Sequence, residues 1–162
     1  MLCSMLSAAS IVVGACSGAT AQAVAGTPPS FDVAIAQDMI NTHRARHGLA
    51  PVAVDERLMR AAQAHSAHLP RPGRVSHRAS DGSRPKARAR TFGYAPKIAS
   101  ENVAAGYNNT TDVITDWQRS RSHNANLLRR GAKHMGMALV YNPQKGRQTY
   151  WTLLMGVPRE AR

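Results

Sequence analysis

Histidine side chains are the first candidates for chemistry in this chain, which has seven of them in 162 residues. Two pairs, His43 with His47 and His65 with His68, have spacings that can place both imidazoles on one helix face. Imidazole pairs of this kind are frequent zinc ligands. Neither pair belongs to a recognised pattern such as HExxH, so we interpret all four as residues of amphipathic helices, with a metal site as the minor alternative.

Two further histidines lie beside regular elements, where binding and catalytic sites are often built. His77 falls in an irregular segment, and His123 falls just past an expected helix end and before an apolar pair. Glu101 and Asn102 stand directly before the apolar run Val103 to Ala105. Two interpretations of this carboxylate and amide stay open: a local cap at the start of a buried segment, or part of a site.

The composition is that of one globular domain. Hydrophobic residues make up 43% of the chain and charged residues 19%. No stretch approaches the roughly 18 consecutive apolar residues that a membrane-spanning helix needs. We therefore expect a soluble domain with no transmembrane helix in its mature form.

The N-terminal segment has the character of an export signal. No charged residue precedes Asp32, and an apolar run leads into small-residue cleavage motifs at 19–21 and 21–23. We expect secretion or a periplasmic location. The expected organisation is a signal peptide at 1–25, a linker at 26–31, the folded domain at 32–158 and a C-terminal tail at 159–162.

An alternative processing site ends at Cys16. The residues VGAC at 13–16 resemble a bacterial lipobox, which would leave a lipid-anchored Cys16 at the new N-terminus. Cys3 and Cys16 are the two cysteines of the chain, and both lie in the signal segment. The folded domain therefore has neither a disulfide nor a cysteine nucleophile.

Basic residues dominate the charge, which is +12 overall. Residues 71–90 hold seven Lys or Arg against one Asp, together with Pro, Gly and Ser, and we expect a long irregular loop. Such a loop suits anionic membrane lipids or cell-envelope polymers. Nucleic acid is not an expected partner, because no nucleic-acid motif is present. General solvation by arginine is the other interpretation of these rim residues: Arg74, Arg78, Arg84, Lys86, Arg88 and Arg90.

The spacing of apolar residues predicts the elements that must position these groups. We expect helices over 32–49, over 55–69 and from 111 to about 120–122, followed by a hairpin of strands at 135–141 and 148–157. Helices first and a hairpin last favour an α+β fold with an antiparallel sheet.

Several ordered motifs resemble the bacterial branch of the CAP superfamily, which includes the cysteine-rich secretory, antigen 5 and pathogenesis-related (SCP-like) proteins. The resemblance covers about residues 33–157. It rests on NTHRARHGLAPV (41–52), DERLMRAAQAHSAHL (55–69), SH (76–77), FGY (92–94), ENVAAG (101–106), Trp117 with SRSHNANLL (120–128), HMGMALVY (134–141) and YW (150–151).

This resemblance implies a three-layer α-β-α sandwich with a cleft lined by two histidines and two acidic residues. The matching positions are His77, Glu101 and His123, with Asn102 in a supporting place. Ser120 stands where other members carry the second acidic residue. The resemblance therefore implies a triad, and inferences that need two carboxylates do not carry over.

Two imidazoles and one carboxylate are ligands that an open zinc site uses, with Glu101 as the candidate catalytic group. They could equally form a hydrogen-bonded network. We expect an exported binding module for a lipid, glycan or peptide, with no required cofactor and with zinc or another divalent cation as the candidate metal. A metal-dependent, protease-like hydrolase is the alternative, although no nucleophile is evident.

Overall fold

The structure is a computed structural model that describes residues 29–69, 75–143 and 148–159. The expected signal peptide, the lipobox cysteine, most of the linker and most of the C-terminal tail lie outside the described residues. The regular elements are α1 (Val33–Arg46), β1 (Ala53–Val54), α2 (Glu56–His68), α3 (Pro85–Thr91), β2 (Pro96–Ala105), α4 (Thr110–Arg119), α5 (Arg121–Leu127), β3 (His134–Asn142) and β4 (Gln148–Pro158).

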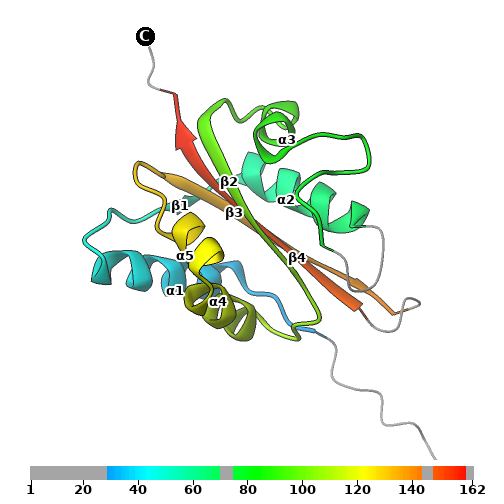
Figure 1. The fold of residues 1–162 in the computed structure, drawn as a ribbon, viewed down its shortest axis with the longest axis horizontal. Coiled ribbons are helices and arrows are strands. Elements are labelled where there is room, and N and C mark those ends of the chain that lie inside the picture. Colours follow the sequence, from blue (N-terminus) through cyan, green and yellow to red (C-terminus); the bar gives the residue numbers. More distant parts are fainter. Residues whose placement is uncertain (1–28, 70–74, 144–147, 160–162) are drawn as a thin grey trace, which may run out of the picture.

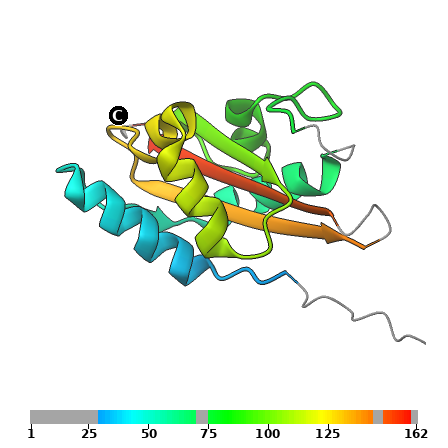
Figure 2. The same cartoon turned by 60° about the horizontal axis from the view of Figure 1, so that its bottom comes forward.

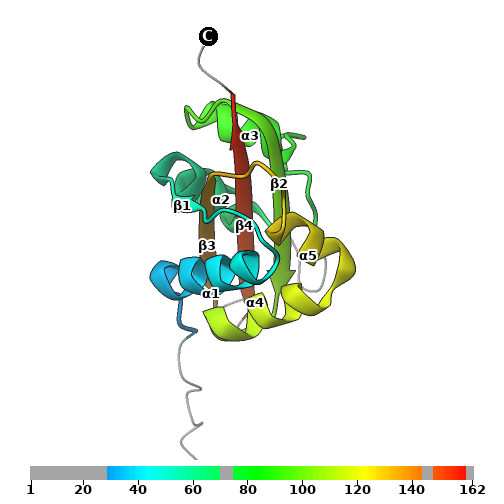
Figure 3. The same ribbon diagram turned by 90° about the vertical axis from the view of Figure 1, so that its left-hand side faces the viewer.

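These elements form three layers, which confirms the expected α-β-α sandwich. The sheet has the order β1-β3-β4-β2, with β4 antiparallel to both of its neighbours. Helices α2 and α3 cover one face, and α1, α4 and α5 cover the other (Figures 1 and 3). On the second face α1 and α4 lie side by side (Figure 2). The short strand β1 pairs with β3 in parallel, so the sheet is mixed at this edge rather than wholly antiparallel.

Helix caps fix where α1 and α2 begin. Asp32 accepts hydrogen bonds from the backbone N–H groups of Ala34 and Ile35, and Asp55 accepts in the same way at the start of α2. After α1, Gly48 adopts a positive φ of 66°, a conformation that few other residues tolerate. The first two helices therefore follow their sequence signals closely.

The sheet separates two apolar cores. Large side chains of β3 and β4, such as Met137 and Trp151, pack toward α1 and α4. Toward α2 the sheet presents Ala138 and Leu154, and Gly136 leaves space that the backbone of Leu58 and Met59 fills. Because a Cβ at Gly136 would collide with that backbone, α2 can lie unusually close to the sheet.

Three predictions about the elements were wrong or incomplete. Residues 71–90 are not all irregular, since α3 begins with Pro85 at a position that Pro favours. The third expected helix ends close to its predicted position, as α4, but a further helix, α5, follows directly, so His123 lies within a helix rather than past a helix end. The run containing Glu101 is neither a cap nor a segment start, because it lies in the middle of β2.

Candidate functional site

Glu101 is the centre of a buried cluster on the face of the sheet that α2 and α3 cover. Glu101 is only 3% exposed, and its backbone pairs with that of Leu154 in β4. The Oε1 atom lies 3.0 Å from Nδ1 of His77 and 3.6 Å from Nε2 of His65. The Oε2 atom accepts a close hydrogen bond from Nη2 of Arg88. One carboxylate is therefore shared by one guanidinium and two imidazoles.

Arg88 does not lie on a solvent-facing rim, which corrects its expected role. It is 5% exposed, and α3 directs it into the protein. Besides Glu101, its Nη1 atom donates to the backbone carbonyls of Ser83 at 2.8 Å and His77 at 3.2 Å. Arg88 thus ties the segment around residues 77–83 to the strand that carries Glu101.

His65 also belongs to this cluster, although its spacing with His68 suggested only an amphipathic surface. It is 1% exposed, and its Nε2 atom lies 2.7 Å from the carbonyl oxygen of Ser76. A carbonyl can only accept, so Nε2 carries the hydrogen and Nδ1 has none. Burial lowers the pKa of His65, against the opposing charge of Glu101. The spacing of His65 from Leu58 and Ala61 would have placed it on the core face.

His77 is the accessible member of the cluster. Its side chain is 54% exposed, while Nδ1 is held by the carboxylate of Glu101. An ionised carboxylate only accepts hydrogen bonds, so Nδ1 is the protonated nitrogen. His77 can therefore contact a further partner through its other ring nitrogen, Nε2.

Asn102 and His123 lie on the opposite side of β2 from the Glu101 carboxylate. Asn102 Nδ2 donates to the carbonyl of His123 at 3.1 Å, and Asn126 Nδ2 donates to Asn102 Oδ1 at 2.9 Å. Burial lowers the pKa of His123, while the carboxylate of Asp116 opposes this and the charge of His77 adds to it.

The three expected metal ligands, His77, Glu101 and His123, are not arranged around a common metal position in this structure. Across the described parts of the chain, no group of three or more His, Cys, Asp or Glu residues could hold a metal ion. One oxygen of Glu101 is occupied by Arg88 and the other by His77. Ser120 interacts with Ser122 at 3.4 Å, and the carboxylate that acts on His123 comes from Asp116 instead. As placed, these residues do not fit a metal.

The remaining rim residues divide between two places. Arg78, Arg84 and Lys86 are exposed around the His77 segment. Arg90 is also exposed, but it lines a separate hollow with Tyr94 and Arg159. Arg74 lies outside the described residues.

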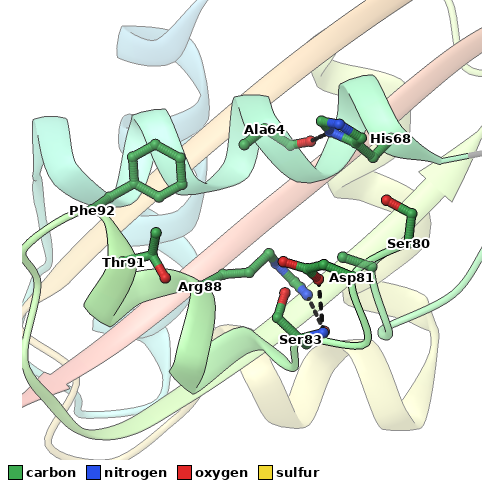
Figure 4. Close-up of a pocket in the computed structure, with 9 residues that line it drawn as sticks. Ala64, His68, Ser80, Asp81, Ser83, Arg88, Thr91 and Phe92 are labelled. Carbon is green, nitrogen blue, oxygen red and sulfur yellow. Dashed lines mark hydrogen bonds between the residues drawn. The ribbon is translucent and has the colours of Figure 1, made fainter.

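A pocket of about 200 Å³ opens between α2 and α3, directly beside Arg88 (Figure 4). Two of the lining residues each have a buried polar atom, Nε of Arg88 and Oγ of Ser83, without a hydrogen-bond partner among the described residues. Most of the wall is apolar. Its lining residues are Ala64, His68, Ala79, Ser80, Asp81, Ser83, Arg88, Thr91 and Phe92.

This three-layer sandwich, with a His/Glu cluster at its edge strand, is the architecture that the resemblance to the CAP superfamily implies. A sequence model of the cysteine-rich secretory protein (CAP) family matches residues 37–155. The chain belongs to this family.

Its relatives include bacterial proteins. The uncharacterized protein YkwD of Bacillus subtilis (strain 168) is 29% identical over 103 residues, which is 64% of this chain and 40% of YkwD. The chain thus spans about 40% of the length of this curated relative.

Solved structures share the fold. An outer surface protein from Borrelia burgdorferi superimposes with a TM-score of 0.69 at 19% identity, covering 78% of this chain and 92% of that one. An extracellular protein with an SCP domain from Bacillus anthracis gives 0.66 at 24%, covering 76% and 39%. At these identities the likeness concerns the fold alone. Within the described residues, none of the helices has the length and apolar character to cross a membrane.

Proposed function

We propose that this protein is an exported binding module whose ligand enters the pocket between α2 and α3. The ligand carries a hydrogen-bond acceptor on a short apolar body, as the end of a lipid, a glycan substituent or a peptide side chain does. Export is supported by the uncharged signal-like segment and by relatives described as extracellular or outer surface proteins.

The observation that carries this proposal is that two residues lining the pocket each have a buried polar atom without a hydrogen-bond partner among the described residues. Buried polar groups are nearly always hydrogen-bonded, and leaving one unpaired costs about 1–3 kcal/mol. Arg88 Nε is a charged donor, and Ser83 Oγ can donate as well. A small rotation of either side chain toward the pocket would let it donate to an acceptor atom of a ligand, while Ala64, Ala79 and Phe92 would contact the apolar part of that ligand.

The Glu101 cluster has a supporting role in this account. Because its carboxylate already accepts from Arg88 and His77, Glu101 is poorly suited to act as a general base. Its role is to hold Arg88 and the segment from Ser76 to Ser83 in place. The imidazole of His77, at the accessible edge of this cluster, is available to contact a larger ligand.

The hydrolase alternative and the metal site stay predictions. A hydrolase using Glu101 would have to release it from Arg88 first, and so would a zinc ion bound by His77, Glu101 and His123. Incubation with a panel of peptides, with and without chelator, tests the hydrolase alternative. Turnover that is lost in Glu101→Gln would favour the hydrolase over the binding module.

An NMR titration with hexanoate tests the pocket, with hexylammonium as the probe of opposite charge. We expect hexanoate to shift the amide signals of Ser83, Arg88 and Phe92, and hexylammonium to shift them little, because hexylammonium has no acceptor atom for Arg88 or Ser83. Ala64→Leu should fill the pocket and remove the response, whereas the exposed Ala125→Leu should preserve it. Equal responses to both probes, or an unchanged response in Ala64→Leu, would contradict the proposal.

A further inference from the structure

A second hollow, of about 660 Å³, lies at the end of the sheet, away from the pocket beside Arg88. Three segments meet there: the start of β2, the loop between α5 and β3, and the end of β4. Figure 1 shows these segments near the end of β4. The hollow is lined by Lys97, Ile98, Arg130, Gly131, Lys133, Val157, Pro158 and Arg159.

The lining of this hollow carries a single sign of charge. Lys97, Arg130, Lys133 and Arg159 are all exposed, and none of the lining residues is acidic. Arg159 also lines the neighbouring hollow that contains Arg90, so the positive surface continues toward α3. Glu160 follows in the sequence and lies outside the described residues. Clustered like charges repel one another, so an anion bound among them relieves an unfavourable field.

The backbone fixes where these charges lie. The pairing of β2 with β4 shifts register between Pro96 and Ile98, so Lys97 stands at a bulge. Bulges redirect a side chain and are common next to functional sites. On the other side of the hollow, the backbone N–H of Lys133 donates to the carbonyl of Gly156 at 3.0 Å. The backbone of two of the four basic residues is therefore anchored at the sheet.

Apolar surface lies between the charges. Ile98 is 40% exposed, and Val157 and Pro158 are partly exposed beside it. Gly131 brings its backbone near this surface, since a Cβ there would lie 3.6 Å from Cγ1 of Val157. Lys and Arg are the residues that bind phosphate, and carbon atoms of an ester would contact the apolar part.

From these observations we infer that the hollow at the sheet end is a binding site for phosphate esters, of the glycerophosphate class. Lys97, Arg130, Lys133 and Arg159 contact the phosphate oxygens, and Ile98 contacts the carbon chain. The same chemistry occurs in a soluble glycerophosphate and in the headgroup of an anionic phospholipid. This inference does not depend on the pocket beside Arg88.

Two probes distinguish these sources: glycerol 3-phosphate in solution, followed by NMR and by thermal unfolding, and phosphatidylglycerol vesicles, followed by sedimentation against phosphatidylcholine vesicles. Sodium chloride at matched ionic strength is the control for screening. We expect glycerol 3-phosphate to shift the amides of residues 97–98, 130–133 and 157–159 and to raise the melting temperature above the chloride control. Vesicle binding in addition would assign the site to a lipid headgroup, and its absence to a soluble ester.

Two variants of equal net charge make the test specific. One replaces Lys97, Arg130, Lys133 and Arg159 by Gln, and the other replaces four exposed arginines on the helices: Arg46, Arg60, Arg119 and Arg121. The first should weaken binding of either probe about tenfold or more, and the second should leave most of it. Equal losses in both variants, or no response of the wild type to either probe at low salt, would overturn the inference. A response to hexanoate in the first variant would show that the Arg88 pocket still functions.

Discussion

Glu101 and Asn102 are consecutive residues of β2, yet their side chains bind partners in opposite layers of the sandwich. Glu101 binds Arg88 of α3 and the His77 segment, whereas Asn102 binds the backbone of α5 at His123. Successive side chains of a strand point to opposite faces of the sheet, so these two residues contact different layers. The edge strand β2 therefore joins two halves of the site that approach from different faces.

Removing the guanidinium of Arg88 should destabilise the protein strongly. Arg88→Met leaves the buried carboxylate of Glu101 without its charged partner, which typically costs about 3–5 kcal/mol. Urea unfolding measures this loss. Arg84→Met, at an exposed site just before α3, is the matched control and should change stability by less than about 0.5 kcal/mol. The double variant Arg88→Met/Glu101→Gln should recover part of the loss; no recovery would mean that charge pairing is not the cause.

Acid should destabilise the protein through His65. Its folded pKa is lowered from 6.5, so near and below that pH the unfolded chain binds more protons than the folded one. The free energy of unfolding should then fall as pH drops from about 7 to about 5. His65→Gln should flatten this slope relative to the exposed control His47→Gln, as urea unfolding at a series of pH values would report. Identical slopes in the two variants would exclude His65 as the source.

Asn102→Ala should disturb the half of the site on α5 and spare the other half. It removes the donor to the carbonyl of His123 and the acceptor for Asn126, at a cost of about 1–3 kcal/mol. NMR should show shifted imidazole signals for His123 and nearly unchanged signals for His77. Asn108→Ala, at an exposed position, is the control for the effect of an Asn-to-Ala change by itself. Comparable shifts at both histidines would argue against the separation of the two faces.

Gly136→Ala tests the close contact of α2 with the sheet. The added Cβ meets the backbone at Leu58 and Met59, which cannot move without shifting the helix. We expect a loss of about 3 kcal/mol in thermal or urea unfolding. Gly106→Ala should cost only about 1 kcal/mol, because its Cβ meets no atom within 4 Å and only its positive φ opposes the change. Similar losses of unfolding free energy in the two variants would indicate that α2 can shift away from the sheet at little cost.

Local signals in the sequence predicted the helices α1 and α2 and the final hairpin. Asp32 and Asp55 cap their helices, and the alternation in β3 assigns its large side chains to one core. The strand containing Glu101 was harder to predict. Its middle carries a carboxylate and an amide, because binding partners from α3 and α5 override the usual apolar composition of a buried strand.

Family motifs singled out His77, Glu101 and His123 as candidate site residues but did not predict their contacts. His77 and Glu101 do interact, as a hydrogen-bonded network would require. The burial of Arg88 could not be predicted because this residue belongs to a run of basic residues. Only the fold distinguishes it from its exposed neighbours. The sequence likewise gave no signal for the basic hollow, whose four cations come from three separate segments.

A structure determined after soaking crystals in zinc tests the central claim most directly, namely that Glu101 is held by Arg88 and His77 to support a binding pocket. We predict that Glu101 keeps both partners and that no zinc density appears between His77, Glu101 and His123. Zinc bound by these three side chains, with Arg88 displaced from Glu101, would contradict the account.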